Sequence, residues 1–406
     1  MTPDDAPSGQ HDPRSASSAN VGAEPSPVDE SLVRTTLIES TRCVVVKVGT
    51  RVLTTADGKL DRERVDRLAG QLARIAESGR QTIMVSSGAV GAGVAKLGLP
   101  RRPTGLAALQ AVAAIGQADL IAAYEASFKE RQRLAAQVLL TKNDLKRRAG
   151  YLHVRNALVG IHELGAIAII NENDSVAVSE LRTTFGDNDG LAAQVAGLFN
   201  DTLLVLLSDI DGLYDRSPEA PGARPISWVR NLDASIMRLA SDSTSNVSKG
   251  GMTSKLNAAK LAATHGHATI IGSGKQNDIL DQIMDGRPIG TLFFPAEHTV
   301  SGRRRWIGSS ADVAGRVHVD QGAAKAISEN GSSLLPVGIV RVEGTFQRGA
   351  VIAIVRPDGV EIGRGLTNYK SQEIQRIAGH ASEKIQSILG HRPYENVVHR
   401  DNFAPN

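Results

Sequence analysis

The feature that most constrains the fold is a regular alternation, between about residues 40 and 295, of short apolar runs with segments of helical spacing. The helical spacing is clearest over Leu60–Ala76 and Leu106–Phe128. The apolar runs are Val44–Val46, Thr82–Val85, Ala136–Leu140, Ala166–Ile170, Thr202–Leu207 and Ala268–Ile271. Strands that are apolar throughout and alternate with helices indicate a parallel sheet covered on both faces. The predicted fold class is therefore α/β, a three-layer αβα sandwich with an open, mainly parallel sheet.

The length of 406 residues exceeds what one domain normally holds. Residues 1–36 are rich in Pro, Ser, Asp and Ala without an apolar period, which predicts a disordered tail. After about residue 312, short strand patterns flank the turn Pro357–Gly359, a sequence typical of a hairpin. We expect an α/β domain over 37–298, a linker over 299–311 with the basic run Arg303–Arg305, a small β-rich, barrel-like domain over 312–395, and a C-terminal tail over 396–406.

Composition argues against several classes of protein. Cys43 is the only cysteine, which argues against a disulfide framework or a cysteine-built zinc site and fits a reducing cytoplasm. Because Cys43 begins a strand pattern, buried filler is favoured over a nucleophile. The net charge of +3 and the 3% of aromatic residues argue against nucleic acid as the main substrate. We find no apolar run near the ~20 residues of a transmembrane helix and no signal-peptide pattern, and expect a cytoplasmic protein without membrane contact.

Polar residues follow the predicted strands, where ligands of open α/β sheets bind. Lys47 closes the first strand and suits a phosphate, although a solvated strand-end lysine fits equally well. Ser86–Gly93 opens a helix whose amides suit an anion, with tight strand–helix packing as the alternative. Asn171–Asp174 and Asp187–Asp189 supply oxygens that suit an ammonium group, a lysine or a magnesium ion. Together the last two clusters predict a small polar ligand.

Two further segments fit a nucleotide. Ser208 and Asp209 follow the strand Thr202–Leu207, although a plain cap and turn is almost as good an interpretation. Lys249–Lys255 places a glycine pair before a helical run, with hydroxyls and a lysine in its first turn, which predicts a phosphate cradle. A flexible loop is the alternative. The sequence lacks a P-loop, a dinucleotide fingerprint, the protein-kinase motifs and a nucleophile elbow.

Taken together, these motifs closely resemble the amino acid kinase family and, within it, the glutamate 5-kinases. They occur in the family's order over about residues 40–295: Val45–Thr50, Val85–Ala89, Ile170–Asp174, Gly186–Asp189, Asp211–Tyr214 and Gly250–Lys255. The segment from about 312 to 390 resembles a PUA domain through Gly331–Ile339 and Tyr369–Ser371.

The resemblance implies a transferase of proline biosynthesis that phosphorylates the γ-carboxylate of L-glutamate with ATP, giving glutamyl 5-phosphate. It also implies magnesium carried with the ATP rather than by protein ligands, feedback inhibition by proline, a homo-oligomer, and hand-off of the product to glutamyl phosphate reductase. A kinase of another acceptor on the same fold, and an RNA-binding protein that acts through the PUA domain, are the alternatives.

The family's residue roles transfer as follows. Lys47 and Lys255 would neutralise the transferring phosphoryl group, and Asp189 would orient them. Ser87, Asp174 and Asn188 would hold glutamate, with Asp174 near its ammonium group. ATP would be held by Lys47, Gly49, Ser208, Asp209, Lys249, Gly250, Gly251, Met252, Thr253, Ser254 and Lys255. The family often has threonine or glycine where this chain has Lys249, so that lysine either contacts phosphate or faces water.

Overall fold

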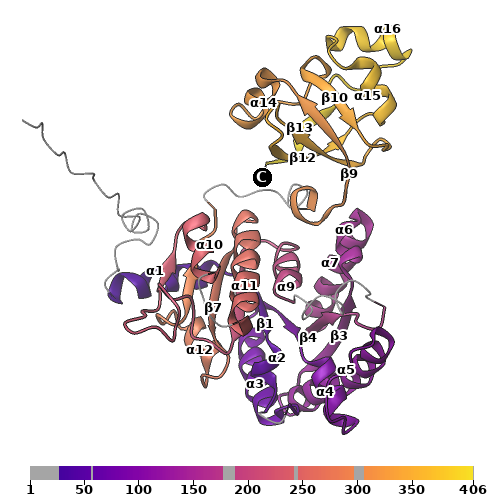
Figure 1. Cartoon of the computed structure of the whole chain (residues 1–406). Helices are drawn as coiled ribbons and strands as arrows, with labels where there is room; N and C mark the ends of the chain where they lie inside the picture. Colours follow the sequence, from indigo (N-terminus) through magenta and orange to yellow (C-terminus); the bar gives the residue numbers. More distant parts are fainter. Residues whose placement is uncertain (1–26, 56–57, 177–187, 242–245, 297–305, 406) are drawn as a thin grey trace, which may run out of the picture.

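The computed structural model describes residues 27–55, 58–176, 188–241, 246–296 and 306–405, which form a larger N-terminal and a smaller C-terminal domain (Figure 1). The larger domain is built on an eight-stranded sheet in the order β3-β4-β2-β1-β5-β7-β8-β6. Its strands are β1 (Cys43–Val48), β2 (Gln81–Ser86), β3 (Leu134–Leu140), β4 (Ala166–Glu172), β5 (Thr202–Ser208), β6 (Trp228–Val229), β7 (Ala268–Ser273) and β8 (Thr291–Phe293). Neighbouring strands are parallel, except that β7 and β8 are antiparallel. The predicted α/β class is confirmed; β6 and β8 are strands that the sequence did not predict.

Helices cover both faces of this sheet. One layer holds α3 (Arg62–Glu77), α5 (Leu106–Lys129) and α12 (Ile279–Met284), and the other holds α7 (Arg148–Glu163), α9 (Asn188–Ala196), α10 (Ala234–Ser241) and α11 (Asn246–Thr264). Successive β1 residues face opposite layers, because strand side chains alternate: Val44 and Val46 belong to one core cluster and Val45 to the other. Short helices α2 (Thr50–Leu53), α4 (Ala89–Lys96) and α6 (Lys142–Lys146) follow β1, β2 and β3. The predicted αβα sandwich is therefore confirmed.

The first described element is helix α1 (Pro27–Ser40), so the expectation of a disordered tail was wrong for residues 27–36. Arg34, whose side chain is 2% exposed, anchors this helix through an ion pair with Glu30 at 2.8 Å. The Arg34 guanidinium donates to the backbone carbonyls of Ser227, Ile289 and Gly290 at 2.9–3.1 Å. Ile38 is buried in the core, with Val33 and Leu37 packed against it, but the other two buried positions of α1 are the charged Glu30 and Arg34. A buried face made partly of charged residues gives only a weak apolar periodicity for sequence analysis to detect.

Helix α5 is long and apolar enough to cross a membrane by length and composition alone. The expectation that no apolar run approaches that length was therefore wrong for this segment. In the fold α5 packs on α3 and α4. Its Tyr124 and Phe128 are fully buried in the core, and the helix forms part of one layer of the sandwich.

The smaller domain is β-rich, as predicted. Its sheet has the order β10-β9-β11-β12-β13. Its elements are β9 (Val313–Val319), α14 (Gln321–Ser328), β10 (Ile339–Glu343), β11 (Val351–Val355), β12 (Glu361–Thr367), α15 (Ser371–Ile377), α16 (Ile385–Leu389) and β13 (Val398–Pro405). The predicted turn joins antiparallel β11 and β12: Gly359 has φ 84°, and the Val360 N–H donates to Asp358 Oδ1 at 3.1 Å. Strand β13 pairs with β12, so the expectation of a C-terminal tail was wrong for residues 398–405.

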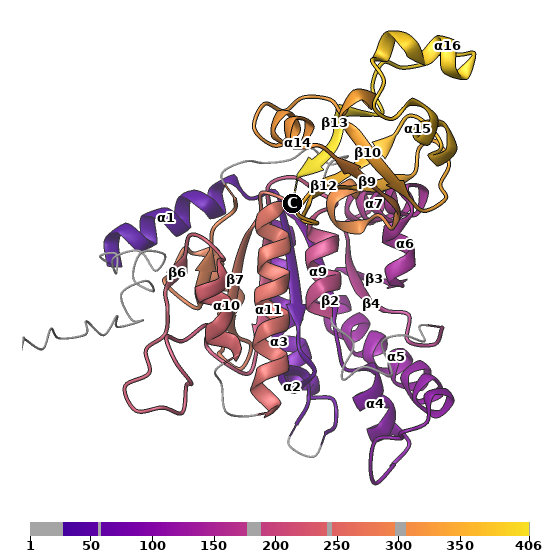
Figure 2. The ribbon, with the colours of Figure 1, turned by 45° about the horizontal axis from the view of Figure 1, so that its top comes forward.

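The two domains meet at the short helix η2 (Trp306–Ser310). Trp306 and Ile307 are buried in the core cluster of the larger domain, and Trp306 Nε1 donates to the Lys146 carbonyl at 3.1 Å. Lys146 also pairs with Asp312 at 2.8 Å. Figure 2 shows the smaller domain beside α6 and α7. The end of the expected linker is therefore packed, while its basic run, Arg303–Arg305, lies outside the described residues.

Candidate active site

The candidate site lies where β1, β2, β4 and β5 reach their carboxyl ends. Because these strands are parallel and adjacent, their carboxyl ends lie side by side. Lys47 in β1, Ser86 in β2, Glu172 in β4 and Ser208 in β5 lie at these ends. Helix α9 starts beside them with Asn188 and Asp189. The motif residues Gly186 and Asp187 lie outside the described residues.

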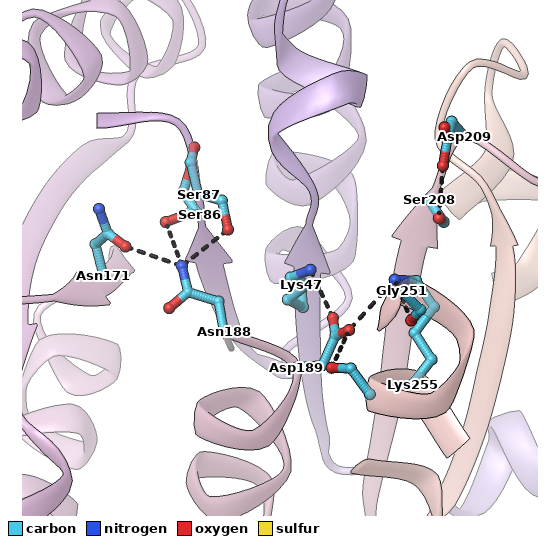
Figure 3. Close-up of polar contacts among 11 residues, drawn as sticks. Lys47, Ser86, Ser87, Asn171, Asn188, Asp189, Ser208, Asp209, Gly251 and Lys255 are labelled. Atoms are coloured by element: carbon cyan, nitrogen blue, oxygen red, sulfur yellow. Dashed lines mark hydrogen bonds and ion pairs between the residues drawn. The ribbon is translucent and has the colours of Figure 1, made fainter. Parts of the chain in front are cut away.

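Asp189 holds two lysines that are far apart in the sequence (Figure 3). Lys47 Nζ lies 2.5 Å from Asp189 Oδ1, and Lys255 Nζ lies 3.2 Å from Oδ2. Their side chains are 9%, 8% and 4% exposed for Lys47, Lys255 and Asp189. Ser254 Oγ donates to the same Oδ2 at 2.9 Å, and Lys255 also donates to the Gly251 carbonyl at 3.3 Å. The structure thus brings together the three residues predicted as catalytic.

The neighbouring charges determine the protonation state of the Asp189 carboxyl. Burial raises the pKa of the Asp189 carboxyl, but the charges of Lys47 and Lys255, with hydrogen bonds from Lys47 and Ser254, outweigh it and hold that pKa below its usual value. Asp189 is therefore ionised at neutral pH. One carboxylate between two ammonium groups leaves a net positive charge in a partly dehydrated site, an arrangement suited to an incoming phosphate.

Asn188 faces the opposite way, into a polar network (Figure 3). Its Nδ2 donates to Ser87 Oγ at 2.9 Å, to the Ser86 carbonyl at 3.2 Å and to Asn171 Oδ1 at 3.0 Å. Asn188 and Ser87 line a cavity of about 450 Å³, which is bordered by α4 and its N-terminal Gly88. Of two consecutive residues of α9, Asn188 therefore lines the cavity and Asp189 contacts the two lysines.

Asp174 lines the same cavity, so the structure brings all three predicted glutamate-site residues to one place. Burial raises the pKa of the Asp174 carboxyl, and the positive charge of Arg102 partly offsets the rise. Arg102 also lines the cavity. The cavity therefore carries charged groups of both signs, as a zwitterionic ligand requires.

The predicted nucleotide residues on β5 lie beside this cluster. Ser208 Oγ donates to Asp209 Oδ1 at 3.1 Å, and Arg51 pairs with Asp209 Oδ2 at 3.1 Å. Burial raises the pKa of Asp209, but hydrogen bonds from Arg51 and Ser208 lower it below its ordinary value. Gly49 donates its N–H to the Leu207 carbonyl at 3.2 Å, which fixes the turn after β1 next to the end of β5.

The glycine-rich segment differs from its prediction. Gly250 and Gly251 lie inside helix α11 rather than in a loop before it, because the helix begins at Asn246. Met252 is buried in a hydrophobic core cluster. Thr253, Ser254 and Lys255 follow in the same helix. The Lys249 side chain lies outside the part of the chain that the structure describes.

Residues 42–273 match the model of the amino acid kinase family, and residues 315–389 match that of the PUA domain. The chain is 65% identical over 381 residues to glutamate 5-kinase of Rhodopirellula baltica, covering 94% of this chain and 98% of that protein. This chain belongs to the amino acid kinase family, among the glutamate 5-kinases. It is also 46% identical over 373 residues to the glutamate 5-kinase of Trichlorobacter lovleyi, covering 92% of this chain and 99% of that one. The resemblance drawn from the sequence is confirmed for the kinase part and for the PUA part.

Three polar residues of this amino acid kinase site were missed by sequence analysis. Arg51 directly follows the Val45–Thr50 motif and Arg102 lies in a segment without a motif, and the partners of both are distant in the sequence. Gln117 lies within the Ala-rich helix α5, where its neighbours suggest only core packing, yet it hydrogen-bonds Asn171 at 2.7 Å. A polar amide within an otherwise apolar helical face was the one available signal.

Cys43 is not part of the site. It is buried in the core at the start of β1, and burial raises the pKa of its thiol to about 12. At that pKa the thiol stays protonated, and the interpretation as core filler rather than nucleophile is confirmed.

Proposed function

We propose that this chain transfers the γ-phosphoryl group of ATP to the γ-carboxylate of L-glutamate, forming glutamyl 5-phosphate in proline biosynthesis. The observation that carries the proposal is the convergence of Lys47 and Lys255 on Asp189, next to a cavity lined by Asn188 and Asp174. Membership among the glutamate 5-kinases, at 65% identity to one of them, supports it.

The chemistry needs little beyond positioning and charge neutralisation. In phosphoryl transfer, negative charge spreads over the equatorial oxygens of the moving group, and fixed positive charges stabilise it. Lys47 and Lys255 supply those charges, and Asp189 holds both ammonium groups in place before substrate arrives. The acceptor carboxylate is ionised at neutral pH and is itself the nucleophile, so the reaction needs no general base.

Glutamate occupies the cavity in this proposal. Asp174 faces its ammonium group, and Asn188 and Ser87, which are hydrogen-bonded to each other, hold it from another part of the cavity wall. Because Asn188 and Asp189 are consecutive, an acceptor held by the first places its γ-carboxylate beside the lysines held by the second. That arrangement brings nucleophile and phosphoryl group together, which lowers the entropic part of the barrier.

ATP lies on the other side of the lysines. Lys47, Gly49, Ser208, Asp209 and the α11 segment Lys249, Gly250, Gly251, Met252, Thr253, Ser254 and Lys255 are proposed to hold it. The described residues contain no group of three or more His, Cys, Asp or Glu side chains that could hold a metal ion. In this proposal Mg²⁺ would be carried with the nucleotide, where it would neutralise charge on the phosphate oxygens.

Family membership also motivates further proposals: a cytoplasmic homo-oligomer, feedback inhibition by proline, and hand-off of the product to glutamyl phosphate reductase. No feature of the described residues favours RNA as a substrate over these roles.

A coupled ADP-release assay tests the function. Purified protein with MgATP is given L-glutamate, N-acetylglutamate, aspartate, carbamate or UMP in separate reactions, with and without proline. We expect turnover with glutamate far above that with every other acceptor. N-acetylglutamate, carbamate and UMP lack the free ammonium group that Asp174 would bind, and the side chain of aspartate is one methylene shorter, so its carboxylate would stop short of the lysines. Faster turnover with one of the other acceptors would assign the chain to a different kinase of the same fold.

A further inference from the structure

We propose that Arg102 binds the α-carboxylate of the acceptor, next to the ammonium group that Asp174 binds. Arg102 is then a specificity-determining residue, which distinguishes an α-amino acid from an amine without that carboxylate. The inference deepens the proposed function and rests on it, because it assumes that the cavity holds glutamate with its γ-carboxylate toward the lysines.

Arg102 and Asp174 bring opposite charges to the wall of the same cavity. The positive charge of Arg102 lowers the pKa of the Asp174 carboxyl against the larger effect of burial, so the guanidinium group lies near that carboxylate. In an α-amino acid the ammonium group and the α-carboxylate are bonded to one carbon atom, so their binding partners must also be neighbours. A guanidinium group suits the carboxylate, because its N–H donors match the two carboxylate oxygens.

The sheet topology places this pair of charges at a distance from the catalytic lysines. Asp174 follows β4, whereas Lys47 lies in β1, and β2 runs between these two strands. With neighbouring strands ~4.8 Å apart, about 10 Å separates β1 from β4. A glutamate that places its γ-carboxylate at the lysines therefore has its α-carbon toward Asp174, and its α-carboxylate beside Arg102.

The segment that carries Arg102 joins α4 to α5, and the packing of these helices holds it at both ends. The two helices lie backbone against backbone, since a Cβ atom at Gly93 would lie 2.0 Å from the Val112 carbonyl oxygen. Helix α4 ends in a Schellman motif, in which the Leu99 N–H donates to the Val94 carbonyl at 3.0 Å. The packing therefore positions the segment before a ligand binds.

Local sequence favours one direction for the Arg102 side chain. Arg102 precedes Pro103, and a residue before proline prefers an extended backbone. Successive side chains of an extended backbone point to opposite sides. This agrees with the cavity wall, which includes Arg102 but not the adjacent Arg101.

Among the described residues, Lys59 is the other cationic side chain on the cavity wall, and it comes from the segment between α2 and α3. The charge that acts on Asp174 is that of Arg102. Because the α-carboxylate must lie beside the ammonium group, we assign it to Arg102 rather than to Lys59. The experiment below measures both.

The test compares L-glutamate with its α-amide, in which a neutral amide replaces the α-carboxylate and the ammonium group is kept. The α-amide is assayed as an inhibitor of the phosphorylation of labelled glutamate, so its Ki is obtained whether or not it is itself phosphorylated. We expect Arg102→Met to raise KM for glutamate ~10-fold or more, the effect of one hydrogen bond between charged groups, and to change Ki for the α-amide less than about threefold. KM for ATP should change less than about twofold, because Arg102 lies away from the lysines. An effect transmitted through Asp174 would weaken both acceptor ligands, since both keep the ammonium group.

Arg101→Met is the matched control, because Arg101 is also an exposed arginine but is not among the residues that line the cavity. It should leave KM for glutamate and Ki for the α-amide at their wild-type values. Arg102→Lys keeps the positive charge and should recover part of the loss in KM. Lys59→Met should leave the ratio of Ki to KM unchanged.

The possible failures are distinguishable. Wild-type protein that does not phosphorylate glutamate would refute the proposed function. With an active wild type, three results would refute only the role of Arg102: equal changes of KM and Ki in Arg102→Met, no change in either constant, or a selective rise of KM in Lys59→Met or Arg101→Met instead.

Discussion

Replacing Asp189 with asparagine tests how strongly one carboxylate organises the site. The change keeps the shape of the side chain but removes the charge that lies 2.5 Å from Lys47 Nζ and 3.2 Å from Lys255 Nζ. Two buried ammonium groups then face each other without a counter-charge. Removing one partner of a buried ion pair typically costs ~3–5 kcal/mol of unfolding free energy. Because the lysines also lose their orientation, kcat should fall ~10²–10³-fold, the usual effect of losing a preorganised charge partner.

Urea unfolding and the ADP-release assay measure the two effects of Asp189→Asn. Asp281→Asn is the control, since it breaks a surface ion pair with Arg74 of 2.6 Å in which Arg74 is more than half exposed. Such pairs contribute ~0–1 kcal/mol. An Asp189→Asn protein whose unfolding free energy is within 1 kcal/mol of the wild-type value, and whose kcat is unchanged, would refute the reasoning.

The destabilisation caused by Asp189→Asn should depend on pH. The pKa of Asp189 is lowered in the folded protein, so the stabilisation is complete above the unfolded pKa, which is near 3.8, and is lost as the pH falls through the folded value. The difference in unfolding free energy between wild type and Asp189→Asn should therefore be constant from pH 7 to about 5 and shrink below about pH 4.

Four more predictions concern the two lysines, Asp174 and Cys43. Lys47→Ala and Lys255→Ala should each remove most activity and leave the circular dichroism spectrum unchanged; unchanged turnover would reject the role of that lysine. Asp174→Ala should raise KM for glutamate far more than KM for ATP, and equal effects would place that carboxylate elsewhere. Because burial raises the pKa of Asp174, wild-type KM for glutamate should rise on acidification at a pH above the ordinary carboxyl value, and Asp174→Asn should lack this rise. Cys43, with a thiol pKa of about 12, should react with Ellman's reagent only in denaturant, and rapid labelling of folded protein would contradict its burial.

The sequence predicted most of the larger domain, because its central strands are apolar on both faces and therefore leave continuous runs. The same reasoning failed where stability comes from polar contacts. Helix α1 is anchored by Arg34 and its backbone acceptors, which no periodicity reveals. Strands β6 and β8 are only two and three residues long, too short to show a pattern.

For the candidate site, the family resemblance already implied that Asp189 orients Lys47 and Lys255. The structure adds the atoms and distances: Asp189 Oδ1 contacts Lys47, and Oδ2 contacts Lys255. The glycine pair Gly250–Gly251 is typical of a loop, and the flanking helical residues overrode that preference. Gln117 was missed because a hydrogen bond between residues 54 positions apart leaves no local signal.

The most direct test of the account is a crystal structure with Mg²⁺, a non-hydrolysable ATP analogue and L-glutamate. We predict that the ammonium groups of Lys47 and Lys255 both lie within about 3 Å of non-bridging oxygens of the terminal phosphate, with Asp189 still between them. A structure in which either lysine points away from that phosphate would contradict the central claim.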